Sequence, residues 1–540
     1  MRTPVQVKNL RNILCVFPAY TPAFGTFAHA FPLLYDVKAF MPPQGLLVLA
    51  AYLPECWPVR FIDENIARAT PEDFAWADAV MVSGMHVQAP QIREIHARAK
   101  AAAKPMVLGG PSVSAAPEMY PDVEYLHIGE MGDATDAVVA RLDDDVTPPT
   151  AQVQFQTKER LPLGAFPIPA YEKIKIGQYL IGSIQFSSGC PYQCEFCDIP
   201  GLYGRVPRLK TPQQIVAELD AMLEQPARPA TVYFVDDNFI GNKKAARDLL
   251  PHLIEWQKSR GYPLAFACEA TLNIAKQPEI LKLMREASFH GMFAGIETPD
   301  IGALKFMRKD QNANLPMLES IRAINSYGIE VTSGIIMGLD TDNDSTADQL
   351  IEFIDRSDIP ILTINLLHAL PKTPLYDRLL IAGRIDESPH LESNVRFLRP
   401  YGDVIDSWKR CIAYAYDPER LFHRFWRQVE TTYVNRLKPP GRGRLTLANL
   451  RMGAVLAWRL FWKVGVQSDY RRHFWHAARH AKRHGQTYAV MGMGFISYHM
   501  IKFTREALRG EQNASFYSAR ERNPQDARSD STTQRQPAAA

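Results

Sequence analysis

Three cysteines, Cys190, Cys194 and Cys197, lie within eight residues in a C-x3-C-x2-C pattern. The chain has seven cysteines in 540 residues, which is too few and too clustered for a disulfide framework. The other four are scattered: Cys15, Cys56, Cys268 and Cys411. Three thiolates can hold three irons of a 4Fe–4S cluster and leave the fourth iron open to a chemical ligand. We therefore expect a reactive cluster, with a zinc site and a purely structural cluster as the alternatives.

The sequence around these cysteines resembles the signature of the radical S-adenosylmethionine (SAM) superfamily, including the aromatic residue before the last cysteine. The resemblance implies that SAM chelates the open iron and is cleaved by one electron to a 5′-deoxyadenosyl radical. It also implies further SAM contacts from the ends of nearby strands. The candidates are Phe196, Asp236, Asp237, Glu297 and Gly334.

The superfamily often carries a Gly-Gly-Glu-like motif after its second strand, whereas residues 234–238 read FVDDN here. This departure leaves a second interpretation for Asp236 and Asp237, namely capping of a helix N-terminus and solvation. No catalytic residue beyond the cluster ligands is assigned from the sequence.

The cluster motif follows the first strand of a region, 181–390, in which strands and helices alternate. The expected strands are 183–187, 231–235, 264–269, 292–296, 330–337 and 361–368. Six such units predict an incomplete (β/α)6 barrel, and residues at the carboxyl ends of barrel strands are the default catalytic positions. A proline-rich stretch, 146–180, precedes this region and is interpreted as a linker.

Residues 1–145 also alternate strands with helical patterns, which predicts a doubly wound, Rossmann-like α/β domain. The expected strands are 12–17, 58–63, 79–83, 105–109 and 124–128. Small residues gather where several of these strands end, and the ligand of such a sheet lies outside its carboxyl end. Tight βα turns without a ligand are the alternative reading.

This domain order resembles the cobalamin-dependent branch of the superfamily, through residues 41–46 (MPPQGL), 107–111 (VLGGP) and 128–130 (IGE). The motif Asp-x-His-x-x-Gly is absent from the sequence, so the resemblance does not imply a histidine ligand to cobalt from that motif. The residues that would surround the nucleotide tail of cobalamin are Ser83, Gly84, Gly109, Gly110, Ser112, Gly129 and Glu130. The alternative is a degenerate domain that only supports the barrel.

After about residue 390 the pattern changes to aromatic-rich helices, and we expect a mostly helical domain at 391–510 and a disordered tail at 511–540. Residues 436–483 contain twelve Lys or Arg and one acidic residue, Asp469. If the stretch is helical, apolar residues occupy much of its surface and one face is basic, formed by Arg444, Arg451, Arg459 and Lys463. A basic face opposite Trp, Phe and Leu is typical of an interfacial helix, so we expect peripheral membrane contact through 436–483.

The alternative for this region is an ordinary helical domain with a solvated basic face. No base-reading fold is recognisable, so no nucleic-acid partner is expected. The longest uncharged run, 485–501, falls short of the ~20 apolar residues of a spanning helix, and the first residues lack a signal-peptide layout. The sequence therefore predicts a cytoplasmic protein without a transmembrane helix, peripheral on the inner face of the membrane.

Residues 14–27 (LCVFPAYTPAFGTF) and 37–45 (VKAFMPPQG) resemble the hopanoid C-2 methylases, and the similarity extends to about residue 518. The resemblance implies three cofactors (a 4Fe–4S cluster, SAM and cobalamin), a hopanoid lipid substrate and an electron donor of the flavodoxin or ferredoxin type. The hypothesis uses SAM twice: one molecule supplies the methyl group through cobalamin, and a second is cleaved so that hydrogen can be removed from an unactivated ring carbon. The alternatives are a cobalamin-dependent radical SAM enzyme with another substrate, such as a cyclase or another methylase, and a non-enzymatic iron–sulfur electron carrier.

Overall fold

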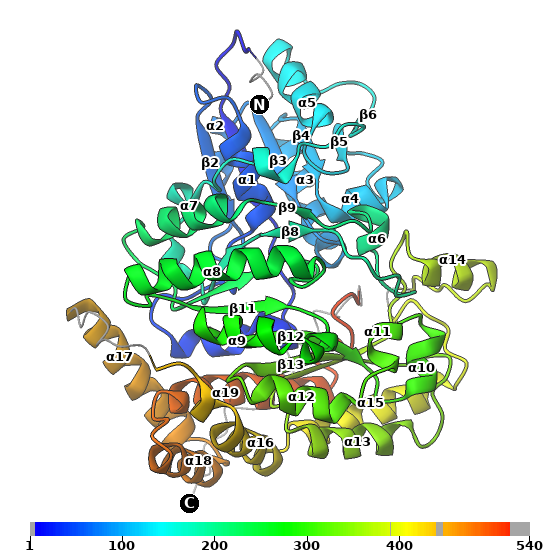
Figure 1. The fold of residues 1–540 in the computed structure, drawn as a ribbon. Helices are drawn as coiled ribbons and strands as arrows, with labels where there is room; N and C mark the ends of the chain where they lie inside the picture. The colour runs from blue at the N-terminus through cyan, green and yellow to red at the C-terminus, as the bar shows by residue number, and fades with distance from the viewer. Residues whose placement is uncertain (1–5, 389, 439–446, 519–540) are drawn as a thin grey trace, which may run out of the picture.

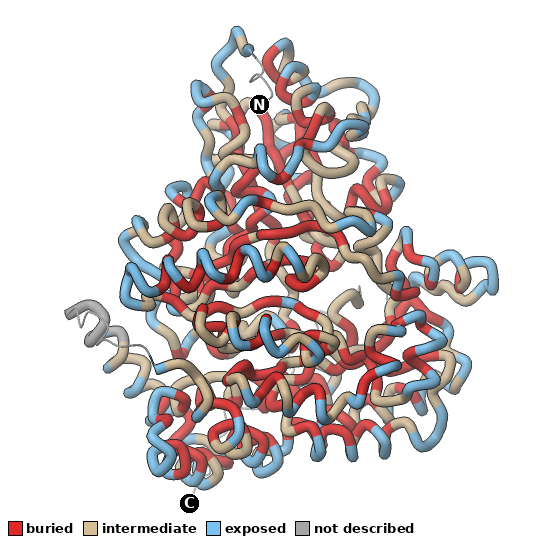
Figure 2. The backbone as a smooth tube through the Cα atoms, in the orientation of Figure 1, coloured by how far each residue is buried: buried red, intermediate tan, exposed pale blue. Residues whose placement is uncertain are grey.

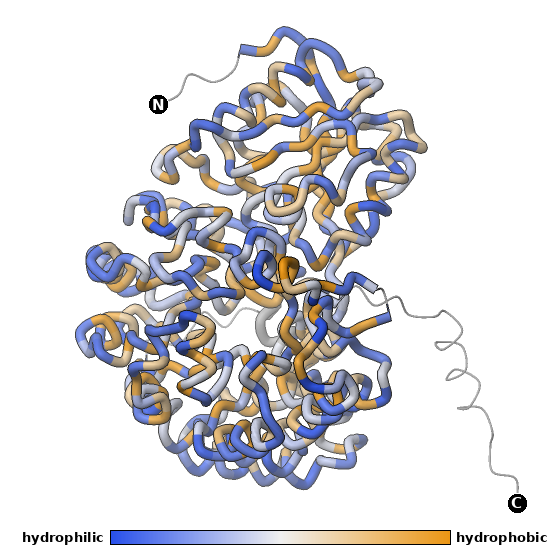
Figure 3. The backbone as a smooth tube through the Cα atoms, turned by 90° about the vertical axis from the view of Figure 1, so that its right-hand side faces the viewer, coloured by the Kyte–Doolittle hydropathy of each residue, from blue (hydrophilic) through white to orange (hydrophobic). Residues whose placement is uncertain are grey.

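The computed structural model describes residues 6–388, 390–438 and 447–518. Two parallel sheets lie one above the other, with a group of helices beneath the second (Figure 1). Buried segments concentrate in the strands of both sheets, and the helices that cover them are exposed along their outer faces (Figure 2). A view turned by a quarter shows apolar segments running through the interior of the N-terminal part (Figure 3).

The N-terminal sheet has six parallel strands in the order β2-β1-β3-β4-β5-β6. Their bounds are β1 Ile13–Phe17, β2 Val59–Asp63, β3 Ala79–Ser83, β4 Met106–Gly109, β5 Tyr125–Ile128 and β6 Val153–Gln156. Successive residues of β1 enter two different apolar cores: Leu14 faces one and Cys15 the other. A parallel sheet with both faces covered explains why its strands read as continuous apolar runs, and the predicted doubly wound domain is confirmed.

The linker prediction for 146–180 is incomplete, because this stretch contains β6, which pairs in parallel with β5. Val153 and Phe155 pack against one of the two cores, and the Phe155 ring lies 6.1 Å from the ring of Tyr125. The strand has four residues and is surrounded by prolines and polar residues, which is why its alternating pattern did not stand out.

The second sheet also has six parallel strands, in the order β14-β13-β12-β11-β10-β7, so β7 and β14 stand at its two edges and the barrel is open. Their bounds are β7 Gly182–Ile184, β10 Thr231–Phe234, β11 Ala265–Glu269, β12 Phe289–Glu297, β13 Glu330–Met337 and β14 Leu362–Leu366. A short antiparallel pair, β8 (Ser187–Ser188) with β9 (Arg208–Leu209), flanks the cluster motif. The incomplete barrel predicted from the sequence is confirmed.

The outer helices of the barrel continue into a C-terminal helical region without a break in the apolar core. Its main helices are α15 Tyr401–Ala415, α16 Pro418–Thr431, α17 Leu447–Leu460, α18 Arg471–Arg483 and α19 Ala489–Leu508. Phe24, from the N-terminal segment, stacks on Tyr416 and contacts Phe503, at ring distances of 5.3 and 4.4 Å. Residues 439–446, which include Arg444, lie outside the described residues. Among the described helices, none is long and apolar enough to cross a membrane.

The predicted disorder from 511 onward is wrong for residues 511–518. Leu366 at the end of β14 donates a backbone hydrogen bond to Ala514, and Ala514 in turn donates to the carboxylate of Glu392 at 2.8 Å. Phe516 lies against the ring of Tyr20 at 6.3 Å. The short apolar group at 514–517 is anchored by partners far away in sequence, which a local composition argument cannot detect. The rest of the predicted tail, 519–540, lies outside the described residues.

Candidate active site

A cavity of about 280 Å³ lies where the carboxyl ends of the two sheets face each other. The N-terminal domain supplies Ser83, Gly109 and Gly129 to its wall, and the barrel supplies Ser188 and Asp237. Ligand sites commonly occur at domain interfaces and outside the carboxyl ends of parallel strands, and this cavity meets both conditions.

Five of the seven residues predicted for the cobalamin pocket line this cavity: Ser83, Gly109, Gly110, Gly129 and Glu130. The remaining two do not. Ser112 is fully buried, and its hydroxyl pairs with Tyr120 at 2.6 Å. Gly84 lies close against the Ile92 side chain. A Cβ added at Gly84 would stand only 2.7 Å from that side chain.

The cavity wall fits a bulky, largely apolar group that approaches backbone closely. Gly110 adopts φ +92°, and a Cβ added there would stand 2.6 Å from Ser83 Oγ, so only glycine leaves this rim open. Deeper in the cavity, apolar side chains from α1 (Gln44–Tyr52) and α5 (Asp133–Asp144) form the walls: Val48, Leu49, Val138 and Val139. These features suit the nucleotide tail of cobalamin, which has an aromatic base and a sugar phosphate.

Ser114 and His127 also line the cavity, and the sequence did not predict them because neither belongs to a motif. Ser114 accepts a hydrogen bond from the Gly129 amide at 2.9 Å and so fixes the turn after β5. His127, at the end of β5, bonds through Nε2 to Thr135 Oγ1 at 2.9 Å, and burial lowers its pKa. The neutral imidazole is thus held against α5.

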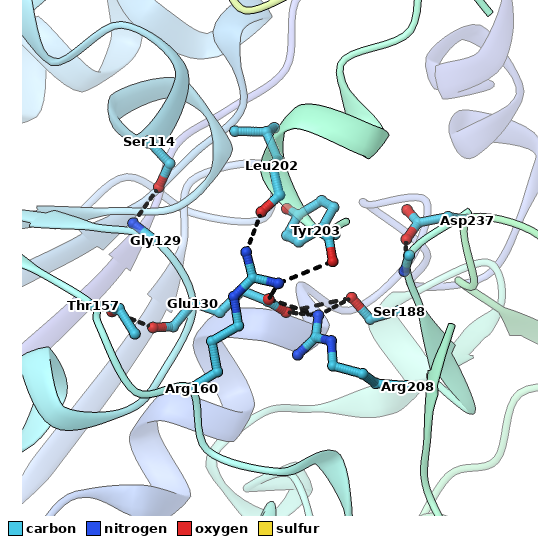
Figure 4. A network of polar contacts seen from close by, with 11 residues as sticks. Ser114, Gly129, Glu130, Thr157, Arg160, Ser188, Leu202, Tyr203, Arg208 and Asp237 are labelled. Atoms are coloured by element: carbon cyan, nitrogen blue, oxygen red, sulfur yellow. Dashed lines mark hydrogen bonds and ion pairs between the residues drawn. The ribbon is translucent and has the colours of Figure 1, made fainter. Parts of the chain in front are cut away.

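Glu130 connects the two domains through a network of charged contacts (Figure 4). Its carboxylate accepts two hydrogen bonds from Arg208 of β9, at 2.6 and 2.7 Å, and pairs with Arg160 at 3.1 Å. Arg160 also donates to the carbonyl oxygens of Leu202 and Tyr203, just beyond the cluster motif. A residue predicted to contact cobalamin therefore uses its side chain to hold the N-terminal domain against the cluster loop.

The cysteine loop follows β8, and its backbone is fixed where the loop begins. Gly189 has φ +100° and donates its amide to Asp237 Oδ2 at 2.7 Å, and the Cys190 amide donates to the carbonyl of Gly204 at 3.1 Å. Burial, above all, raises the pKa values of the Cys190 and Cys197 thiols, and the neighbouring thiols raise them further. The thiols therefore share one enclosed space in which bound iron would be needed to stabilise thiolates, as a cluster does.

Two of the predicted SAM residues meet around a buried lysine. Lys309 Nζ lies 2.5 Å from Glu297 Oε1 and 5.4 Å from the centre of the Phe196 ring. Burial opposes the charge of Lys309, but Glu297 and the Cys194 thiol outweigh it, and the pKa of Lys309 is raised. Glu297 adopts φ +68°, a strained conformation that aims its carboxylate at Lys309. The sequence did not reveal Lys309, because the contact spans twelve residues with no fixed motif.

Asp236 and Asp237 do not cap the next helix, since Asn242 caps α8 (Lys243–Ser259). Asp236 accepts hydrogen bonds from the Phe186 amide at 2.7 Å and the Ser187 hydroxyl at 2.9 Å, and burial raises its pKa to about 7. The pKa of Asp237 is raised to about 6, also by burial first. Both carboxylates position the strand and turn that lead into the cysteine loop.

The last predicted SAM residue, Gly334, lies in the middle of β13, where a Cβ would stand 3.2 Å from the Phe293 ring. Two ionisable residues that were not predicted interact with the charged groups around the cluster loop, one at the end of β11 and one in the C-terminal segment. Burial raises the pKa of Glu269 to about 7, with a further contribution from Asp237. Tyr517, from the segment predicted to be disordered, is enclosed beside Asp198 and Cys197, and its pKa is raised by burial.

Comparison with known families and proteins agrees with this architecture. Residues 32–140 match the B12 binding domain, 184–354 the radical SAM superfamily and 373–513 a domain of unknown function. The hopanoid C-2 methylase of Rhodopseudomonas palustris is 58% identical over 94% of this chain and 97% of its own length. An uncharacterized methyltransferase of Synechocystis is 34% identical over 87% of both chains.

Among solved structures, a radical SAM methyltransferase from Kitasatospora setae has the same fold. It matches with a TM-score of 0.56 and 15% sequence identity, over 88% of this chain and 99% of its own.

The fold and the site define a cobalamin-dependent radical SAM methyltransferase, whose cofactors are a 4Fe–4S cluster, SAM and cobalamin. Within that class, the chain belongs to the family of the Rhodopseudomonas palustris hopanoid C-2 methylase.

Proposed function

We propose that this enzyme methylates C-2 of the hopanoid A-ring. The observation that carries the proposal is the 58% identity to the hopanoid C-2 methylase, which extends over nearly the full length of both chains and includes all three regions of the fold. The ring carbon has no acidic proton and no lone pair, so it cannot act as a nucleophile. Hydrogen removal by a radical avoids this difficulty, and the radical and methyl-carrying chemistry comes from the cofactors.

The residues of the chain would hold these cofactors on two sides of one space. Cys190, Cys194 and Cys197 would ligate the cluster, with Gln311 Nε2 lying 3.3 Å from Cys194 Sγ. The pair Glu297–Lys309, next to Phe196, would meet the charged amino acid part of SAM. The rim formed by Ser83, Gly109, Gly110 and Gly129 would surround the nucleotide tail of cobalamin.

The Glu130–Arg208–Arg160 network would hold the two cofactor sites at a fixed distance from each other. It joins the turn after β5 to the loop that follows the cysteines, so both sides of the cavity keep one orientation. Methyl transfer requires close and aligned reactants, and fixed domains supply that alignment.

A membrane-embedded substrate would require the enzyme to reach a lipid surface. An exposed apolar ridge at the end of α17 and in the π-helical turn η10 (Phe461–Val466) supports such contact. It consists of Trp458, Phe461, Trp462 and Val466. The Trp458 and Trp462 rings stack at 6.2 Å and stay largely exposed. Arg471, Arg472 and Arg479 line a neighbouring hollow, so the ridge and its basic neighbour match an anionic bilayer.

The decisive experiment is lipid analysis of a hopanoid-producing host with and without the gene. We expect 2-methylhopanoids to appear only with the active gene, and a Cys194→Ala variant to give none. Unchanged lipids in a host that contains the protein with its cluster intact would exclude the hopanoid substrate. The reduced, reconstituted protein should also release 5′-deoxyadenosine from SAM, which an electron carrier would not do.

Membrane contact has its own test. Full-length protein should sediment with vesicles containing anionic phosphatidylserine and much less with neutral vesicles. Replacing Trp458 and Trp462 with Ser should reduce binding to anionic vesicles several-fold, whereas Tyr488→Ser, at an exposed position outside the ridge, should not. Equal binding by the two variants would contradict the proposed surface. The identity of the one-electron donor, of flavodoxin or ferredoxin type, can be tested by supplying each to the same assay.

A further inference from the structure

The C-terminal region contains a group of possible metal ligands that the methylation reaction does not use. Glu430 of α16 faces His480 of α18 and His484, the residue that caps the end of α18, and one ligand atom from each lies within 4.8 Å of the others. His480 and His484 are one helical turn apart, so both imidazoles face the same way. In the described part of the chain, no other group of three His, Cys, Asp or Glu residues meets this condition.

We propose that Glu430, His480 and His484 bind a divalent zinc-type cation that links α16 to α18. The site lies within the domain of unknown function, far along the chain from the cluster cysteines. The proposal is independent of the substrate of the enzyme.

The buried histidine of this group is unsatisfied. His480 is 7% exposed, and its Nε2 makes no hydrogen bond to any described residue. Glu430 Oε1 lies 3.4 Å from this nitrogen, close enough to share one cation but without the geometry of a hydrogen bond. A buried polar atom without a partner is costly, so its position beside a carboxylate and a second imidazole calls for a ligand.

The other two members are already oriented as metal ligands usually are. His484 Nδ1 lies 3.0 Å from the backbone carbonyl of His480, so the N–H is on Nδ1 and the lone pair of Nε2 is free. Trp426 Nε1 donates to Glu430 Oε1 at 3.1 Å, and Arg427 holds Oε2 at 2.8 Å. Such second contacts fix the tautomer and rotamer of a ligand before the ion arrives.

The ligand set selects the class of cation. Two imidazoles and one carboxylate suit zinc and similar transition metals, whereas calcium and magnesium prefer oxygen ligands only. Three protein ligands leave a fourth tetrahedral position, and the exposed edge of His484 lets water fill it. An ion there would fasten α18, whose arginines line the basic hollow, to α16.

The test uses full-length protein with its iron–sulfur cluster loaded, so that the cysteines are occupied. Equilibrium dialysis against Zn²⁺ followed by elemental analysis should give one zinc per chain for the wild type. His484→Ala and Glu430→Gln should each weaken zinc binding at least tenfold. The matched control is His473→Ala, which removes a histidine of α18 outside the group and should bind like the wild type.

X-ray absorption at the zinc edge gives a second readout that does not depend on activity. We expect a first shell of nitrogen and oxygen with imidazole scattering. Equal zinc binding by the wild type and His484→Ala, or sulfur in the first shell, would overturn the proposal. In that case His480 and Glu430 form only an ion pair when the imidazole is protonated.

Discussion

The carboxyl ends of the two parallel sheets face one shared space, yet they present different chemistry there. The N-terminal sheet ends in Ser83, Gly109-Gly110 and Gly129, with few ionisable groups at the cavity. The barrel ends in thiols and in buried ionisable groups such as Asp236 and Lys309. Both are six-stranded parallel sheets, so the difference in chemistry comes from the residues that follow each strand.

This difference indicates that the N-terminal edge binds a cofactor, whereas the barrel edge takes part in the chemistry. The N-terminal edge offers exposed backbone and apolar walls, which suit a large cofactor that brings its own reactivity. The barrel edge keeps charges in an enclosed site, where each charge has a strong effect on bound SAM and on the cluster. Substitutions at the barrel edge should therefore affect chemistry and stability most, and those at the N-terminal edge should affect one binding step.

The largest effect is expected for Cys194→Ala. Loss of one thiolate leaves the cluster without a third anchor, so iron content should fall and 5′-deoxyadenosine formation should drop to background. Anaerobic reconstitution with iron and sulfide, followed by product analysis, checks this. Cys56→Ala, at an exposed cysteine distant from the motif in sequence, serves as the matched control and should keep full activity.

The second largest effect is expected for Lys309→Met. It leaves the buried Glu297 carboxylate without its partner, and breaking a buried ion pair in this way costs about 3–5 kcal/mol. Urea unfolding of the cluster-loaded protein should report the loss, together with weaker SAM binding. Adding Glu297→Gln to the same chain should recover most of the stability; a double variant as unstable as Lys309→Met would contradict the pairing.

Asp236→Asn should change how stability depends on pH. Burial raises the folded-state pKa of Asp236 to about 7, so between pH 4 and 7 the folded protein holds a proton that the unfolded chain releases. Stability is therefore lost as pH rises through this window, by up to about 1.4 kcal/mol per pH unit. The isosteric amide removes that slope, so its stability relative to wild type should increase from pH 4 to pH 7. Parallel curves for the two proteins would show that Asp236 ionises normally.

The smallest effect is expected at the N-terminal edge. Gly110→Ala forces a side chain into a left-handed backbone and against Ser83 Oγ, narrowing the rim. Cobalamin affinity should fall about tenfold while the cluster and SAM cleavage stay intact, measured by titration and by 5′-deoxyadenosine release. Gly25→Ala is the control, because a Cβ there meets nothing within 4 Å. Loss of the cluster in Gly110→Ala would contradict the prediction that substitutions at the N-terminal edge affect only cobalamin binding.

The sequence predicts much of this arrangement where the signal is local. Local requirements of the fold and the site are visible in the sequence: the cysteine spacing, the apolar runs of β3 and β13, and the glycines after β4 and β5. The sequence does not reveal contacts between distant segments: Arg208 and Arg160 on Glu130, Lys309 on Glu297, or Tyr517 in the barrel. Their partners are fixed only once the domains pack, and β6 is too short to show its period.

One measurement tests the central claim that the cluster and cobalamin serve a single reaction at a shared cavity. Reconstituted protein supplied with cobalamin, SAM, a reductant and a hopanoid should be assayed anaerobically for all products. We predict equal amounts of S-adenosylhomocysteine, 5′-deoxyadenosine and methylated hopanoid. Methylated product formed without 5′-deoxyadenosine, or formed equally well without cobalamin, would contradict this account.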